Sequence, residues 1–403
     1  MKILMLTPYL PYPPSSGGQV RSYNLIKHLS RNHDIYLVAL IKSKGEETYK
    51  NNLQRFCKEI HLCKRSESPW TLKNIVKSVF GEFPFLVVRN YSPQASKVVG
   101  DLLQQHKFDL IHAETFYIMP HIPPTHVPIL LVEQTIEYRV YQHYVRKLRF
   151  PFIRPFFHFD IVKLKHWEKT YWKKANLVGA VSKDDEEKMH ELLPNLQTSI
   201  IPNAAGEDLL QIYDALKTPT ENPIFLYQGN FSWLQNSEAA RILISDIFPA
   251  IRKRLPNARC IIAGQRAYSK LGNFDRGGIK IVDIASSNLN EVIDVYSKAA
   301  IFLAPIKGPG GTRLKILGAM AAGLPVISSP TGVSGLNASH NKNVIIAHTT
   351  QDFVNAAEKL YKNKKLYMKI KRNARQLVDD TYSWDKVSKI LEKIYLQLVT
   401  SHT

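Results

Sequence analysis

Cysteine is scarce in this 403-residue sequence, which contains only Cys57, Cys63 and Cys260. Three such scattered residues cannot form a disulfide framework, and none has the Cys-x-x-Cys or Cys/His spacing of a metal site. We therefore expect a protein of a reducing compartment that holds no metal.

Long hydrophobic runs are also lacking. No stretch approaches the roughly 20 apolar residues that a membrane-spanning helix needs. The N-terminal segment MKILMLTPYLPYPPSSGG is interrupted by prolines and has no small-residue cleavage site, so it predicts a buried strand and not a signal peptide. These absences predict a cytoplasmic protein.

Acidic residues are few: 34 Asp and Glu stand against 54 Lys and Arg, which gives a net charge of +20. The excess is shared by both halves of the chain, so there is no basic tail. Such a charge favours anionic partners, namely phosphorylated ligands, a membrane surface or nucleic acid. Because no RRM, KH or zinc-finger signature is present, we expect no nucleic-acid partner.

Short apolar runs alternate with helix-length amphipathic segments along the chain. In the first half the predicted strands are KILMLT, DIYLVAL, EIHLC, DLIHAE, PILLVEQ, LVGAVS and TSIIPN. Nearly continuous apolar strands separated by helices predict an α/β fold with a parallel sheet covered on both faces.

The polar stretch LKTPTENP at 216–223 interrupts this pattern, which then starts again. The second set of predicted strands is IFLYQG, ARCIIAG, IKIVDI, IFLAPI, LPVIS and NVIIAH, and a helix is predicted over 236–254. The tail YSWDKVSKILEKIYLQLV predicts a closing amphipathic helix.

We therefore expect two doubly wound, Rossmann-like domains. The first covers 1–205 together with the C-terminal helix 384–403, a linker covers 206–222, and the second domain covers 223–383. Ligands of such folds bind at the carboxyl ends of the strands, here in a cleft between the domains.

Two glycine-rich loops precede predicted helices. Gly17 and Gly18 stand before a helix that begins near Gln19, and GPGGTRLKILGAMAAGLPVIS (308–328) opens on a second loop. Free backbone N–H groups at a helix start suit an anion such as phosphate. The alternative is a surface turn followed by a helix whose cations face water. Neither loop has the G-x-G-x-x-G pattern, which argues against a nicotinamide oxidoreductase.

Five segments together carry a family resemblance. In chain order they are GGQVRSYNLIKHL, DLIHAETFY, VSKDDEEKM with IIPNA, YQGNFSWLQNSEAARIL, and GGTRLKILGAMAAGLPVIS. This set resembles the retaining, nucleotide-sugar-dependent glycosyltransferases of family 4, within the glycosyl transferases group 1. The resemblance covers nearly the whole chain and implies the two-domain GT-B fold, with a C-terminal helix that closes back toward the N-terminal domain.

The resemblance also implies a donor site. The matching positions are Gly17, Gly18, Asn230, Asp283, Gly310, Gly311, Thr312, Arg313, Lys315 and Gly318. In the family the glycines and the threonine approach the donor pyrophosphate, and Arg313 and Lys315 are its implied charge partners. Charged donors suit this role because negative charge builds on the diphosphate as it leaves. Asp283 lies in the segment next to the nucleobase, and Asn230 lies in a loop that faces the donor.

The segment DLIHAETFY ends a predicted strand, and the period of two places His112 and Glu114 on the same face. The resemblance implies a catalytic position near the transferred sugar for Glu114. His112 is a second candidate catalytic residue, and the alternative is that it is a buried histidine with its hydrogen bonds satisfied. The segment EQTIEY matches a family motif at Glu137 and Tyr138 but departs from it at Gln134 and Thr135.

Gly318 is the main departure from the family. The residue before AMA is normally a glutamate that binds the ribose hydroxyls, and a second family glutamate, eight positions earlier, falls at Gly310. A carboxylate on a ribose contributes about 1.5–3 kcal/mol, and a mid-helix glycine costs roughly 1 kcal/mol. We therefore expect no structural reason for glycine here. Weaker donor binding, compensation by another residue, and loss of transfer activity remain open.

The predicted function is a retaining, metal-independent glycosyltransferase with no cofactor, which uses a UDP- or GDP-sugar and a glycan or lipid-linked acceptor. The leaving diphosphate is expected to accept the acceptor's proton, while the enzyme supplies positioning and electrostatics. One alternative is a non-catalytic or decayed nucleotide-sugar-binding protein, which Gly318 favours. Another is a nucleotide-sugar epimerase.

The stretch 139–174 mixes ten Lys and Arg with seven Phe and Trp residues and only two acids. Basic residues among aromatics suit an anionic lipid surface. The alternative is that the aromatics pack on the sheet and the cations face water. The first interpretation predicts peripheral attachment to the inner face of the cell membrane.

Overall fold

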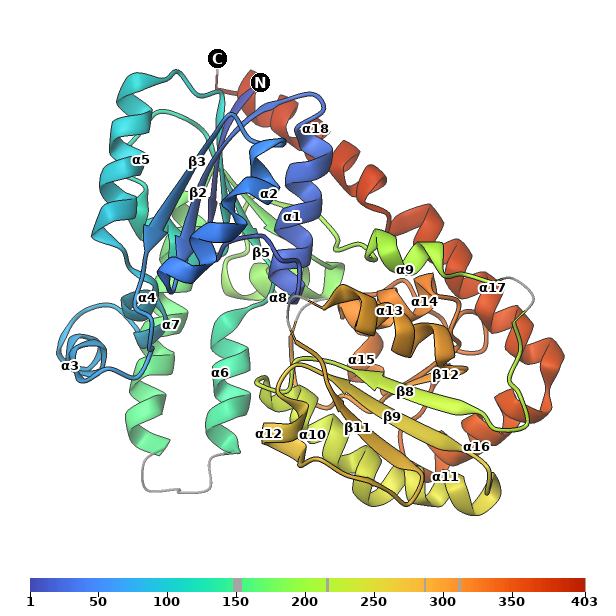
Figure 1. Cartoon of the computed structure of the whole chain (residues 1–403). Coiled ribbons are helices and arrows are strands. Elements are labelled where there is room, and N and C mark those ends of the chain that lie inside the picture. Colours follow the sequence, from blue (N-terminus) through green and yellow to red (C-terminus); the bar gives the residue numbers. More distant parts are fainter. Residues whose placement is uncertain (148–153, 215–216, 286–287, 311–312, 403) are drawn as a thin grey trace. The chain divides into compact units, whose positions relative to one another are not determined.

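The computed structural model describes residues 1–147, 154–214, 217–285, 288–310 and 313–402. The chain folds as two units (Figure 1): Met1–Pro202 with Trp384–Thr403, and Asn203–Ser383. Residues 206–222, the expected linker, belong to the second unit. They include helix α9 (Glu207–Gln211), and Leu209, Leu210 and Ile212 pack against that unit's core. Apolar side chains therefore fix this segment to the second unit.

The first unit contains a seven-stranded sheet in which all the strands are parallel, in the order β3-β2-β1-β4-β5-β6-β7. The strands are β1 (Lys2–Thr7), β2 (Asp34–Ile41), β3 (Glu59–Lys64), β4 (Leu110–Glu114), β5 (Ile129–Glu133), β6 (Leu177–Ala180) and β7 (Thr198–Ile200). Each predicted strand of this half is present. Their apolar runs are almost wholly buried, as a sheet covered on both faces requires.

The first unit has helices on both faces of this sheet and one at its edge (Figure 1). They are α1 (Gly17–Leu29), α2 (Asn51–Gln54), α3 (Leu72–Phe80), α4 (Phe85–Asn90), α5 (Pro93–Gln105), α6 (Glu137–Arg146), α7 (Arg154–Lys174), α8 (Lys183–Leu192) and α18 (Trp384–Thr400), with 3₁₀ turns η1 (Lys44–Lys50) and η2 (Phe116–His121). The predicted closing helix is α18. Its apolar face, which includes Val387, Leu391 and Tyr395, is buried as the helix packs on α1 and β4.

The second unit contains a sheet in the order β10-β11-β9-β8-β12-β13-β14. The strands are β8 (Ile224–Gln228), β9 (Arg259–Gly264), β10 (Asp275–Arg276), β11 (Ile279–Asp283), β12 (Ile301–Ala304), β13 (Val326–Ser328) and β14 (Ile345–Ile346). All the pairs are parallel except β10 with β11, which form a short hairpin around Gly277 and Gly278. The sequence analysis missed this hairpin, although a Gly-Gly pair between extended residues is its signal.

The helices of this unit are α9, α10 (Leu234–Ile242), α11 (Phe248–Arg254), α12 (Ala267–Leu271), α13 (Leu289–Lys298), α14 (Leu314–Ala321), α15 (Pro330–Val333), α16 (Thr350–Lys362) and α17 (Lys364–Thr381). The helix predicted over 236–254 is divided by a π-helical segment, η4 (Leu243–Ile247). Pro249 follows that segment and has no N–H to donate. Its ring would also crowd the carbonyl one turn earlier in an α-helix, which accounts for the wider turn.

Candidate functional site

Most of the predicted donor residues of the second unit lie at one edge of its sheet. The strand order reverses direction between β8 and β12, and ligands of open α/β sheets bind beyond the carboxyl ends of the strands at such a point. Asn230 follows β8. Gly310, Arg313 and Lys315 follow β12, and Lys315 lies in the first turn of α14.

Lys315 is a half-buried cation whose hydrogen-bond partners are neutral. Its Nζ donates to Asn236 Oδ1 at 2.6 Å and to the Tyr227 hydroxyl at 3.4 Å, and it stands 4.9 Å from the centre of the Tyr227 ring. Among the described residues no carboxylate lies within ion-pair distance of it. Burial lowers the pKa of Lys315 well below its usual value, and the nearby charge of Arg313 lowers it further. An anion at this position would favour the charged form of the lysine.

Arg313 folds back over the loop that precedes it. Its Nη2 donates to the Gly308 carbonyl oxygen at 2.6 Å, and its guanidinium lies against Gly310. Gly310 has a φ of +150°, and a Cβ there would collide with the Arg313 guanidinium. The family glutamate that falls at this position therefore does not fit this loop. Gly311 and Thr312 lie outside the described residues.

Asn230 holds the loop after β8 in place. Its Nδ2 donates to Gln265 Oε1 at 2.7 Å, and its carbonyl oxygen accepts from Asn236 Nδ2 at 2.7 Å. Asn236 therefore links Asn230 to Lys315. The sequence analysis did not single out Asn236, although it falls within the matching segment YQGNFSWLQNSEAARIL.

Asp283 stands apart from this group. It is exposed at the carboxyl end of β11, which β9 separates from β8, and its Oδ1 accepts from the Tyr268 N–H at 3.4 Å. Its carboxylate makes no ion pair among the described residues.

Gly318 lies one turn beyond Lys315 on α14 and is buried. A Cβ at this position would come within 2.7 Å of Leu209 Cδ1, from α9, and 3.7 Å of the Tyr296 hydroxyl. The expectation that glycine has no structural reason here is therefore wrong, because Leu209 occupies the space where a larger side chain would begin.

This packing gives a prediction for Gly318→Glu. Introducing the family glutamate alone is expected to destabilise the second unit by about 1–3 kcal/mol, because the carboxylate enters space that Leu209 fills. Urea denaturation of Gly318→Glu and of Gly318→Glu with Leu209→Ala checks this. The double variant is expected to recover part of the loss, and an equal loss in both would contradict the packing explanation.

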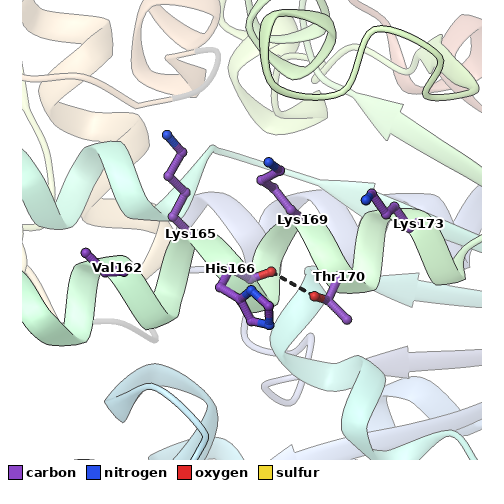
Figure 2. A pocket seen from close by; sticks show the side chains of 6 residues that line it. All are labelled: Val162, Lys165, His166, Lys169, Thr170 and Lys173. Carbon is purple, nitrogen blue, oxygen red and sulfur yellow. Dashed lines mark hydrogen bonds between the residues drawn. The ribbon is translucent and has the colours of Figure 1, made fainter.

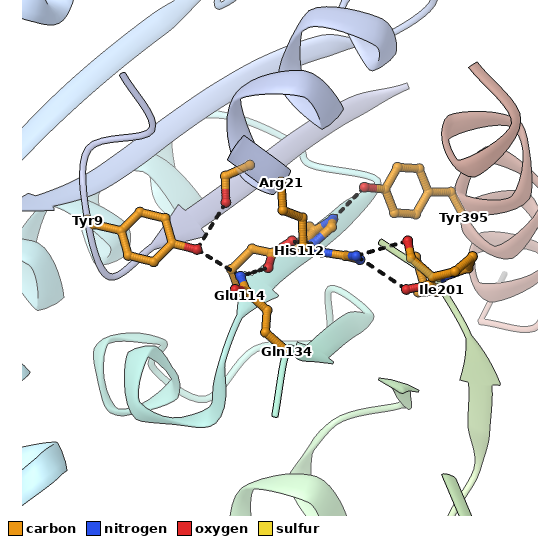
Figure 3. Close-up of polar contacts among 9 residues, drawn as sticks. Tyr9, Arg21, His112, Glu114, Gln134, Ile201 and Tyr395 are labelled. Atoms are coloured by element: carbon orange, nitrogen blue, oxygen red, sulfur yellow. Dashed lines mark hydrogen bonds and ion pairs between the residues drawn. The ribbon is translucent and has the colours of Figure 1, made fainter. Parts of the chain in front are cut away.

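In the first unit, a buried polar network lies between β1 and β4, where the strand order also reverses (Figure 3). Glu114 at the end of β4 is completely buried, and its Oε1 lies 3.3 Å from Arg21 Nε and 3.1 Å from His112 Nε2. Its Oε2 accepts from Gln134 Nε2 at 2.6 Å. His112 Nδ1 lies 2.5 Å from the Tyr395 hydroxyl of α18.

Electrostatics favour the ionised form of Glu114. Burial raises its pKa, but the Arg21 charge and the hydrogen bonds from His112 and Gln134 outweigh burial and bring the pKa to about 2. Because the carboxylate can only accept, His112 Nε2 carries the proton in this hydrogen bond.

The network also holds the first glycine loop. Gln134 Nε2 donates to the Tyr9 hydroxyl at 2.7 Å, and Gly18 lies directly against this hydroxyl and the Gln134 side chain. Gly17 beside it is exposed. The structure therefore brings together Gly18, His112 and Glu114. Gln134 links Gly18 to Glu114, which in turn bonds His112. Both His112 and Glu114 are completely buried, and their catalytic roles stay predictions.

Several members of this network were missed from the sequence, namely Tyr9, Arg21, Gln134 and Tyr395. Arg21 carries a signal that could have found it, because it is a charged residue on the apolar face of α1, which begins at Gly17 and not near Gln19 as expected. Its Nη1 also donates to the carbonyl oxygens of Ile201 and Pro202, at 3.2 and 3.1 Å. In the sequence, Gln134 is distinguished only by its departure from the family motif.

A second buried cluster contains three carboxyl groups. Glu133 Oε1 accepts from Trp172 Nε1 at 2.9 Å, and the Glu168 oxygens accept from the N–H groups of Glu137 and Tyr138 at 2.8 and 3.3 Å. Burial and mutual repulsion raise the pKa values of Glu133 and Glu168 well above their usual range, and burial raises that of Glu137 to about 7. Within the described part of the chain, no group of three or more His, Cys, Asp or Glu side chains is placed to hold a metal ion.

The basic and aromatic stretch 139–174 divides into two kinds of side chain. Trp172 is completely buried, and the half-buried Trp167 packs against the core and donates from Nε1 to the Glu82 carbonyl oxygen. Phe150 and Phe152 lie outside the described residues. Lys165, Lys169 and Lys173 project to the same side of α7 (Figure 2). None of the helices in the described ranges is long and apolar enough to cross a membrane.

Comparison with known proteins agrees with this geometry. Residues 222–363 match the family model of the glycosyl transferases group 1. The matched segment lies within the second unit. The group 1 glycosyltransferase match contains Asn230, Arg313 and Lys315, and therefore the whole described donor-side cluster.

Similar proteins extend over nearly the full length of the chain. An uncharacterized 44.6 kDa protein in the cps region of Klebsiella pneumoniae is 23% identical, with 96% of this chain and 97% of that protein covered. Sucrose-phosphate synthase from Thermosynechococcus elongatus has a TM-score of 0.70 and 16% identity, with both chains fully covered. Anabaena HepE in complex with UDP and glucose has a TM-score of 0.62 and 15% identity, with 98% and 100% covered. The predicted GT-B fold is thus confirmed.

Proposed function

We propose that this chain transfers a sugar, with retention and without a metal ion, from a UDP- or GDP-sugar to a glycan or lipid-linked acceptor. The observation that carries the proposal is Lys315, a half-buried cation beside Arg313 whose hydrogen-bond partners are neutral. Two cations at the carboxyl edge of a parallel sheet are suited to a diphosphate. That HepE is described in complex with UDP and glucose supports a nucleotide-sugar donor.

In the proposed reaction Lys315 and Arg313 contact the donor diphosphate and stabilise the charge that develops as it leaves. The departing phosphate oxygen accepts the acceptor's proton, so the chain supplies orientation and charge. Gly17 and Gly18 approach the donor, and the network around Glu114 and His112 holds their loop in position. The relative in a cps region supports a polysaccharide or its lipid-linked precursor as acceptor, presented at an anionic membrane surface.

The test is the binding of UDP and GDP by isothermal titration calorimetry. We expect one diphosphate to bind the wild type with micromolar affinity and to bind Lys315→Met about 10–150-fold more weakly, the equivalent of a lost hydrogen bond between charged groups. Because the bound anion raises the pKa of Lys315, binding is also expected to take up a proton, which titration in buffers of different ionisation enthalpy detects.

The matched control is Lys298→Met, which removes an exposed lysine of the same unit that pairs with Asp294. Equal affinities of Lys315→Met and the wild type would overturn the donor assignment. Diphosphate binding with no sugar transfer or donor hydrolysis would favour a nucleotide-sugar-binding protein without activity. The observation that favours this second function is Leu209, whose Cδ1 lies 2.7 Å from where the Cβ of a side chain at position 318 would stand.

A further inference from the structure

Helix α3 is amphipathic, but its polar side faces inward. Asn74 and Ser78 are buried, whereas Leu72, Ile75, Val76 and Phe80 are exposed. Asn74 Nδ2 donates to Ser66 Oγ at 2.9 Å and to the Pro69 carbonyl oxygen at 3.0 Å, while Ser78 Oγ donates to Asp160 Oδ1 at 2.9 Å. The polar side is thus occupied by specific bonds, and the apolar side is presented outward.

The exposure is large for such side chains. Phe80 is 85% exposed and Leu72 is 77% exposed, and Trp70 just before the helix is 57% exposed. Isolated exposed apolar residues are ordinary, but several large ones on one short helix indicate an interaction surface.

The N-terminal part of α7 extends this surface. Phe156, Phe159 and Val162 are each at least 60% exposed. Lys163 ties α7 to α3, because its Nζ donates to the carbonyl oxygens of Ser78 and Gly81 and stands 5.3 Å from the centre of the Phe159 ring. Figure 1 shows α3 at the edge of the first unit, beyond α4 and α7.

Cations border the apolar residues. Lys73 and Lys77 of α3 are exposed, and α3 contains no acid. Further along α7, Lys165, Lys169 and Lys173 line a depression of about 300 Å³ with Val162, His166 and Thr170 (Figure 2). The two acids of α7 point elsewhere, because Asp160 accepts from Ser78 and Phe85 and Glu168 accepts from the start of α6.

We propose that the exposed apolar side of α3 and the face of α7 from Phe156 to Lys173 dock onto an anionic lipid bilayer. Apolar and aromatic side chains would enter the boundary between headgroups and acyl chains, and the lysines would contact the lipid phosphates. The inference deepens the membrane contact of the proposed function and rests on it. It differs from the contact predicted for the stretch 139–174 because the helix that inserts, α3, lies outside that stretch.

A bilayer fits this surface better than a folded protein partner. The apolar side chains project from a short helix at the edge of the unit and have lysines beside them, an arrangement suited to a soft, negatively charged layer. A protein interface would instead call for a surface with few charges at its centre.

The experiment is co-sedimentation of the full chain with vesicles. We expect binding to vesicles of phosphatidylcholine with 30% phosphatidylglycerol at low salt, and at least tenfold weaker binding to pure phosphatidylcholine or at 0.5 M salt. Leu72→Ser with Phe80→Ser is expected to weaken binding at least tenfold, and Lys169→Gln with Lys173→Gln at least threefold.

The controls are Leu396→Ser, which removes an exposed leucine on α18, and Lys183→Gln with Lys58→Gln, which removes exposed lysines of the same unit. The proposal is overturned if the wild type does not bind anionic vesicles, or if the controls weaken binding as much. It is also overturned if the protein is a dimer that Leu72→Ser with Phe80→Ser converts to a monomer. UDP and GDP titrations of the same variants separate this outcome from failure of the donor site.

Discussion

Replacing Arg21 by methionine is expected to lower the free energy of unfolding by about 3–5 kcal/mol, because it leaves the Glu114 carboxylate buried without its counter-ion. Arg21 and Glu114 are both completely buried. The substitution also removes the donor to the Ile201 and Pro202 carbonyl oxygens. Urea denaturation followed by circular dichroism at pH 7 measures the loss.

The double variant Arg21→Met with Glu114→Gln tests the cause. Since the glutamine removes the unpaired charge, the double variant is expected to be more stable than Arg21→Met alone by at least 1 kcal/mol. Arg31→Met, at an exposed arginine of the same helix region, is expected to change stability by less than about 0.5 kcal/mol. An Arg21→Met protein as stable as the wild type would show that the ion pair does not matter for folding.

The second prediction with a large effect is that the stability of the folded protein depends on the ionisation of Glu137. Burial raises the pKa of Glu137 in the folded protein to about 7, against about 4.3 in an unfolded chain. The folded state therefore holds this proton more tightly, and the resulting stability is fully present below about pH 4.3 and lost as pH rises through 7. We expect Glu137→Gln to gain about 2–3 kcal/mol relative to the wild type between pH 5 and pH 8.5.

Denaturation of both proteins at pH 5, 7 and 8.5 measures this difference. Glu82→Gln, at an exposed glutamate of the same unit, is expected to follow the wild type at every pH. A constant difference between Glu137→Gln and the wild type over this range would place the pKa of Glu137 near its usual value and so contradict the effect of burial. The stability of Glu137→Gln is still expected to fall somewhat as pH rises, because the pKa values of Glu133 and Glu168 are also raised.

The sequence was most informative where one residue pattern has one structural meaning. The apolar runs predicted the strands of both sheets except β10, because buried parallel strands admit few other residues. The motif after β12 correctly placed Arg313 and Lys315 at the edge of the sheet. It could not show that Lys315 pairs with Asn236, since that contact joins residues 79 positions apart.

What the sequence could not supply was the contact between distant segments. Gly318 looked like a lost function because Leu209 lies more than 100 positions earlier on another helix. Similarly, the hydrophobic residues of α3 predict an amphipathic helix, but only the bonds from Asn74 and Ser78 decide which side faces out. The polar network around Glu114 draws on β1, α1, β4, β5 and α18, so no single motif contains it.

The first unit is built from two separate segments of the chain, and this affects the order in which its parts are synthesised. Its last helix, α18, is synthesised after the entire second unit, and Tyr395 from that helix completes the hydrogen bonding of buried His112. A ribosome adds about 5–20 residues each second, so the 181 residues from Asn203 to Ser383 impose a delay of roughly 10–40 s. Throughout that interval the surface of α1 and β4 that α18 will cover stays exposed to water. The first unit is therefore the first to be synthesised and the last to complete its packing.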